Sequence, residues 1–259
     1  MDAFWFALAL KAIATAFVVV LASVVAERVG PKWGGLVASI PVSAGPAYLL
    51  LAMQHDAAFI AHSALLSFAS GAATWVFLVA FMRVSDRLSL ALSLPTALLI
   101  WLGTAIVIRN VPWTWAMALL ANVIAFSVAT TWGRSSAVQL HSTNAAANAW
   151  YELPLRAAMV GAFVATVVTL SDAIGPSATG IAAVFPIALT SLAILINRRF
   201  GIAGARAALT GAITPMIGIA CGFAVLSLTP EIIGTRPALA LSLCTALVWP
   251  MSIIVRHRA

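Results

Sequence analysis

The chain is built from long apolar segments separated by short polar connections, and this pattern sets the class of fold. A helix needs about 20 apolar residues to cross the hydrocarbon core of a bilayer. Charged residues make up only 8% of the 259 residues, against about 25% in soluble domains. The sequence therefore predicts an all-α integral membrane protein. Its nine predicted transmembrane helices cover residues 3–26, 33–53, 57–82, 88–108, 112–132, 149–171, 177–197, 201–228 and 235–255.

Basic residues fall unevenly in the connections between these spans. Lys and Arg concentrate in the cytoplasmic loops of membrane proteins, so the asymmetry indicates an orientation. We expect the N-terminus outside, the C-terminus in the cytoplasm, and residues 133–148 as a cytoplasmic linker. The predicted cytoplasmic side holds Arg28, Lys32, Arg83, Arg87, Arg134, Arg198, Arg199, Arg206, Arg256 and Arg258, and the outer side holds Arg109 and Arg236.

A short pattern occurs twice in the chain, at an offset of 145 residues. Residues 30–41 read GPKWGGLVASIP and residues 175–186 read GPSATGIAAVFP, so both fit GP-x3-G-[LI]-x-A-x2-P. A second match pairs residues 91–98 with residues 240–247. Internal repeats of this kind in a hydrophobic chain are typical of secondary transporters.

The span count makes this repeat an inverted one. Each unit has four spans, and the additional span at residues 112–132 places the second unit upside down relative to the first. We expect a first repeat at 1–110, a connecting helix and linker at 111–148, and a second repeat at 149–259. The simpler alternative is a duplication that only makes a stable pseudo-symmetric bundle, whether or not a solute moves through it.

Two cations occupy equivalent positions in the first span of each unit. Lys11 and Arg156 are 145 residues apart, and Lys11 lies about 12 Å along its helix from the outer end. A charge at that depth costs about 3 kcal/mol to insert and tends to face a polar cavity or a partner. The pair is predicted to attract an anionic group of a substrate. The alternatives are snorkelling to the headgroups and pairing of Arg156 with Glu152.

Two prolines form the second matched pair. Pro41 and Pro186 lie inside predicted spans, where each removes a backbone N–H and frees the carbonyl four residues earlier. Interrupted helices near the midplane are a recurrent way to build transport sites, while a purely structural kink is the alternative. The hydroxyls of Ser43, Thr190 and Ser191 follow these prolines and complete the predicted substrate-binding residues.

Small residues and lone polar residues in the spans are ambiguous. Gly180, like Gly218 and Gly222 of a GxxxG pattern, is expected to permit close helix packing. His62 lies well inside a span, where proton coupling is one role and hydrogen-bonded packing is the other. The indoles of Trp75 and Trp249 are deep enough to line a cavity or to pack against lipid.

Several functional classes are disfavoured. The net charge of +7 sits in short membrane loops, so no nucleic-acid partner is expected. The motifs of zinc proteases, P-loop NTPases and serine hydrolases are absent from the sequence, as is a Cys/His cluster with metal spacing. We therefore expect no enzyme activity, no metal and no cofactor. An intramembrane lipid-modifying enzyme is the faintest alternative.

The motifs also carry a resemblance. Pro154-Leu155-Arg156, Gly175-Pro176, Gly180-Ile181 and Pro186 look like a group of uncharacterised bacterial inner-membrane proteins. The segment from Gly35-Leu36 to Pro41 is similar to small four-span GlpM-like proteins. The resemblance implies a tandem of GlpM-like repeats in a bacterial inner membrane and no particular activity. The first unit departs from it, with Ala9-Leu10-Lys11 at the position of Pro154-Leu155-Arg156.

The leading hypothesis is a secondary transporter or permease for a small, anionic or amphipathic metabolite. Its expected partners are the lipid bilayer and that small-molecule substrate. The alternative is a non-transporting membrane scaffold or envelope-biogenesis factor. The sequence leaves the oligomeric state open, with a homo-oligomer among the alternatives.

Overall fold

The computed structural model describes residues 44–134 and 152–258, with side chains except at 133–134, 152–157, 199 and 253–258. The described residues are helical and contain no strand, which confirms the all-α prediction. The helices are α3 (Ala44–Leu51), α4 (Ala57–Val84), α5 (Leu90–Arg109), α6 (Trp115–Arg134), α7 (Glu152–Ala183), α8 (Ile187–Ala212), α9 (Met216–Leu226), α10 (Pro230–Ile233) and α11 (Thr235–Arg258).

Several of these helices are suited to a bilayer. Four are long and apolar enough to cross one by length and composition: Ala57–Val84, Leu90–Arg109, Trp115–Trp132 and Ala158–Ala183, of which the last is divided at Gly175. The pair Phe200–Ala212 and Met216–Leu226, bent by 43°, makes a fifth if it is counted as one broken span. The described part of the chain is thus that of a membrane-embedded protein. The predicted span 3–26 and most of 33–53 lie outside the described residues.

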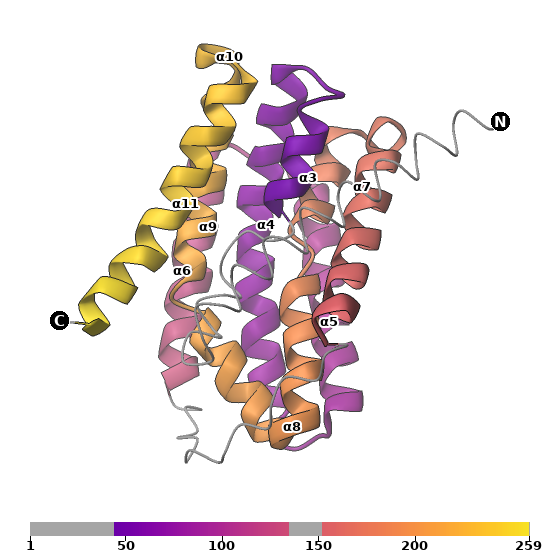
Figure 1. The fold of residues 1–259 in the computed structure, drawn as a ribbon, viewed down its shortest axis with the longest axis vertical. Coiled ribbons are helices and arrows are strands. Elements are labelled where there is room, and N and C mark those ends of the chain that lie inside the picture. The colour runs from indigo at the N-terminus through magenta and orange to yellow at the C-terminus, as the bar shows by residue number, and fades with distance from the viewer. Residues whose placement is uncertain (1–43, 135–151, 259) are drawn as a thin grey trace.

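Helix α4 forms the centre of the bundle, and the other helices surround it (Figure 1). In the most apolar 18-residue stretch of α4, 78% of the residues are buried. The share in the corresponding stretch is 33% in α5 and 17% in α6. The N-terminus of α4 is fixed by Asp56, whose side chain accepts the N–H of Phe59 at 2.8 Å, an N-cap that satisfies one of the otherwise unpaired first-turn donors. Helix α4 contacts α5, α6, α7, α8, α9 and α10.

The outer helices turn large apolar side chains away from the protein. Contiguous apolar surface of this kind is rare on soluble monomers, but it is the expected surface of a protein whose solvent is lipid. On α5 and α6 the most exposed of these residues are Leu99, Val107, Leu120, Leu92 and Ile124.

Two glycines with positive φ divide long helices. Gly175 (φ 74°) splits α7, and Gly201 (φ 66°) splits α8, because glycine adopts this left-handed region without a steric penalty. After Gly175, Pro176 starts a second leg of α7 that folds back, so that Phe185 meets Phe163 with ring centroids 5.2 Å apart. The Gly-Pro of the repeated pattern therefore makes a reversal at residues 175–176.

The ends of the bundle carry different connections. The α3–α4 connection and α10 lie at one end, and the reversal of α8 lies at the opposite end (Figure 1). Near this second end Arg206 of α8 forms an ion pair with Asp86 of the α4–α5 connection. Arg83 at the end of α4 lies over the ring of Trp132, 4.4 Å from its centroid. These two contacts connect α8 to the α4–α5 connection and α4 to α6 at this end of the bundle.

Candidate functional site

The chain that follows the Gly175 reversal is interrupted at Pro186. The second leg of α7 ends at Ala183, and α8 starts at Ile187. Because Pro186 has no N–H, the carbonyl of Ala182 loses its usual helical donor. The N–H of Phe185 takes this place at 2.9 Å. The predicted interruption at Pro186 is present, and a tight backbone turn, with no ligand, satisfies the freed carbonyl.

A second interruption separates α8 from α9 at residues 213–215. Two indoles stabilise it: Trp75 of α4 donates its N–H to the carbonyl of Ile213 (3.4 Å), and Trp249 of α11 donates to the carbonyl of Thr214 (3.1 Å). Carbonyls freed inside a membrane-spanning segment need such partners, because no water replaces them in the hydrocarbon region. Trp75 is 3% exposed, so this hydrogen bond lies in the interior of the bundle.

Pro186 at the first interruption and Met216, the residue that follows the second, line a common cavity in the bundle. Its volume is about 70 Å³. One water molecule needs at least about 10–15 Å³ of such space, so the cavity has room for several. Pro186 lies on one wall, Met216 beside the second interruption on another, and Trp75 on the wall formed by α4. The remaining described lining residues are Ala44, Gly71, Thr74, Ala183, Val184, Phe185, Ala188, Leu189, Ile219, Ala220 and Phe223. We call this space the central cavity.

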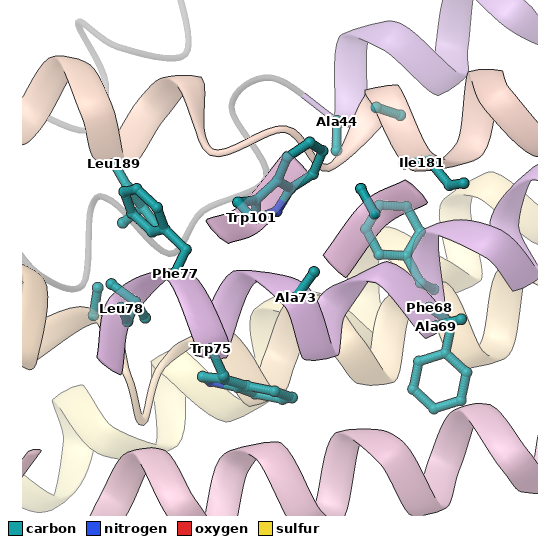
Figure 2. Packing of buried hydrophobic residues seen from close by; sticks show 14 of the residues in the cluster. Ala44, Phe68, Ala69, Ala73, Trp75, Phe77, Leu78, Trp101, Ile181 and Leu189 are labelled. Atoms are coloured by element: carbon teal, nitrogen blue, oxygen red, sulfur yellow. The ribbon is translucent and has the colours of Figure 1, made fainter. Parts of the chain in front are cut away.

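Aromatic side chains pack against two different sides of α4. Figure 2 shows Trp101 on the side of α4 that faces the chain of α7 and α8, and Trp75 on another side. Trp101 makes a T-shaped contact with Phe185 at 5.2 Å, while Trp75 packs against Phe126 of α6 at 5.5 Å. Phe185 is thus held beside the interruption by the ring of Trp101.

Polar atoms lie next to this apolar cavity. The amide of Asn122 donates from Nδ2 to the carbonyls of Phe68 (2.7 Å) and Ala118 (2.8 Å), and its Oδ1 has no partner. A Cβ on Gly71 would lie 2.8 Å from that oxygen. Glycine at position 71 therefore lets the amide of α6 approach α4 beside the cavity.

Four hydroxyl residues line one face of α4. Ser63, Ser67, Ser70 and Thr74 are spaced by four, three and four residues and are all buried, which places them on one side of the helix. Ser67 donates to the carbonyl of Gly180 at 2.6 Å and accepts from the hydroxyl of Tyr48 at 2.7 Å. The hydroxyls of Ser63 and Ser70 have no partner. We call these four residues the hydroxyl stripe.

Histidines continue this polar contact between α4 and α7. His62 Nε2 lies 3.0 Å from the hydroxyl of Ser177. His55 donates from Nε2 to the hydroxyl of Ser171 (2.7 Å), since that hydroxyl already donates to the carbonyl of Val168. His62 is exposed on the bundle surface, and a proton-coupling role for it stays a prediction.

The structure separates the predicted site residues into two groups. Pro186 lines the central cavity, Thr190 is buried with an unpartnered hydroxyl, and Ser191 donates to the carbonyl of Ala188 at 2.9 Å. Ser191 is therefore satisfied by its own helix. Lys11, Pro41 and Ser43 lie outside the described residues, and Arg156 lies in α7 at a position without a described side chain.

The sequence interpretation missed the break at Pro215 and the contact between Asn122 and Gly71. The second interruption follows from Pro215, which lies inside the predicted span 201–228 and was a readable signal for a broken helix. Trp75 appeared only as a residue deep enough to line a cavity. No sequence signal links Asn122 to Gly71, because their contact depends on how α6 crosses α4.

Comparison with known proteins gives no relative: no protein-family model, curated protein or solved structure matches this chain.

Proposed function

We propose that this chain is a secondary transporter or permease for a small amphipathic metabolite, and that it acts in a bacterial inner membrane. The observation that carries the proposal is the central cavity, which is lined by Pro186 at one interruption and by Met216 next to the interruption at Pro215. Interrupted helices that face each other near the middle of a membrane protein are a recurrent construction of transport sites. A bundle that served packing alone gains nothing from two such breaks.

The lining of the cavity supports the amphipathic part of the proposal. Among its described lining residues the only side-chain hydroxyl is that of Thr74, and no charged residue occurs. The unpartnered Oδ1 of Asn122 lies next to Gly71 of the cavity lining, 2.8 Å from where a Cβ would stand. Such a site favours a solute with an apolar body and one or two hydrogen-bonding groups. The anionic part of the proposal rests on Lys11 and Arg156.

The charge distribution supports the proposed orientation. Arg83 and Arg206 make their contacts with Trp132 and Asp86 toward one end of the bundle, and that end is the proposed cytoplasmic side. The opposite end, with the α3–α4 connection and α10, is the proposed outer side.

The cavity is tested by filling it. Ala220 lines the cavity, whereas its neighbour Cys221 is exposed on the bundle surface. Ala220→Leu should lower solute flux in proteoliposomes by at least about tenfold, the equivalent of about 1.4 kcal/mol, because the added carbons occupy the space of the substrate. Cys221→Leu adds comparable bulk on the lipid side of the same helix turn and should leave flux unchanged. A metabolite panel supplies the solutes.

The result that contradicts the proposal is equal flux in the two variants at equal folded protein. The non-transporting scaffold is the alternative, and the small volume of the cavity favours it. That alternative expects no solute in the panel to be carried by the native chain.

The matched cations have their own test. Lys11→Gln and Arg156→Gln should each abolish uptake of anionic members of the panel while folded protein remains in the membrane, because each removes a charge that attracts the solute. Retained flux in both variants would show that the cations only snorkel or pair locally. Neutral members of the panel serve as the internal control.

A further inference from the structure

A second hollow lies on the outside of the bundle, between α5 and the two legs of α7. Its volume is about 240 Å³. Its walls are apolar side chains, among them Leu102 and Ile106 of α5 and Ile181 of α7, and its floor is aromatic, with Trp101, Phe163 and Phe185. We call this hollow the α5–α7 groove.

The surface around the groove faces lipid. Leu102 is 49% exposed and Ile106 is 55% exposed, and both lie on a helix long and apolar enough to span a bilayer. The medium that meets the open side of the groove is therefore made of acyl chains. A solute from water would first have to cross that medium.

One end of the groove carries a positive charge. Arg109 is the last residue of α5 and lines the groove. Trp101 of the floor is eight residues earlier, which places Arg109 about 12 Å further along the helix axis. No carboxylate of a described residue pairs with Arg109; the described ion pairs are those of His55 with Asp172 and of Arg206 with Asp86.

We propose that the α5–α7 groove binds an acyl chain of an anionic membrane lipid, whose phosphate pairs with Arg109. The chain would follow the apolar walls from the membrane surface at Arg109 down to the aromatic floor. The guanidinium supplies a charge-assisted, bidentate partner for the phosphate. The proposal is independent of solute transport, because it concerns a site on the lipid side of the bundle.

The groove and the central cavity share a wall. Phe185 lines both spaces and stands between the rings of Trp101 and Phe163, each 5.2 Å away. It belongs to the short non-helical connection that precedes Pro186. An acyl chain in the groove would therefore press against the residue that closes the cavity from the side.

Trp101 is a built-in reporter for this site. Bromine on an acyl chain quenches a tryptophan that it contacts, so the protein is reconstituted in vesicles that mix plain phosphatidylcholine with brominated phosphatidylglycerol or brominated phosphatidylcholine. The difference between the native chain and Trp101→Phe isolates the signal of this indole. We expect Trp101 to be quenched at about fivefold lower mole fraction by the anionic lipid.

Two variants separate recognition of the lipid headgroup from binding of its acyl chain. Arg109→Gln should remove the preference for the anionic lipid while quenching at high lipid fraction remains. Ala178→Leu fills the groove and should weaken quenching by both lipids, whereas Ala162→Leu on the exposed side of α7 should change neither. Equal quenching by the two lipids in the native chain, or quenching unaffected by Ala178→Leu, would overturn the proposal. So would a Trp101 signal that no brominated lipid quenches, the result expected if a second copy of the chain covers the groove.

Discussion

Replacing Gly180 with alanine should destabilise the protein by about 1–3 kcal/mol, the range of overpacked interiors. The added Cβ would overlap the backbone carbonyl of Ser63 on α4, and a backbone carbonyl has no rotamer with which to move aside. The second leg of α7 would have to move away from α4. That shift also loosens the hydrogen bond from Ser67 to the carbonyl of Gly180. The melting temperature in detergent should fall by several degrees.

Gly103→Ala provides the matched control for this prediction. Gly103 is also inside a helix, but no atom lies within 4 Å of an added Cβ there. Alanine should raise stability at this site by about 0.5–1 kcal/mol, since glycine loses more backbone freedom on folding. A Gly180→Ala protein that melted as late as Gly103→Ala would mean that α7 and α4 do not meet at this point.

Trp75→Phe should lower both stability and transport. The change leaves the carbonyl of Ile213 without its indole donor, and an unsatisfied buried acceptor costs about 1–3 kcal/mol. The shape of one wall of the central cavity changes at the same time. Melting in detergent measures the first effect, and uptake well below the melting temperature measures the second.

The control is the same substitution at the end of the bundle. Trp113 donates to the carbonyl of Ile108 at 2.8 Å, at the end of α5, where water can replace the indole. Trp113→Phe should therefore cost less than about 1 kcal/mol and leave uptake intact. Equal losses in the two variants would show that the second interruption has no special need of Trp75.

Local chemistry was predictable where a single residue type controls the backbone. The Gly175-Pro176 reversal falls in the predicted loop between residues 171 and 177, because only glycine takes that φ at no steric penalty and proline suits the first turn of a helix. Pro186 interrupts its span for the same kind of reason. Close packing was also predicted correctly at Gly180 and at the GxxxG pair, where a Cβ on Gly218 or Gly222 would meet backbone oxygens of α11.

The broken span at residues 201–228 shows the limit of reading hydropathy. Its mean hydropathy predicts one continuous helix. In the structure a break that includes Pro215 divides it into two helical segments bent by 43°. The two matched segments lie at offsets of 145 and 149 residues, so the position equivalent to Pro215 in the predicted first repeat falls at residues 66–70, where α4 runs unbroken. The repeated pattern alone therefore does not determine where each unit is broken.

The sequence by itself determined the all-helical class, the lipid-suited segments and the positions of the Gly175 and Pro186 breaks, because hydropathy and backbone dihedral preferences are local properties. Only the tertiary structure decided which breaks share a cavity, which indoles satisfy the carbonyls of Ile213 and Thr214, and which residues form the α5–α7 groove. Those contacts join residues on different helices or helix segments, so they depend on how whole helices cross. No short pattern in the chain encodes that crossing.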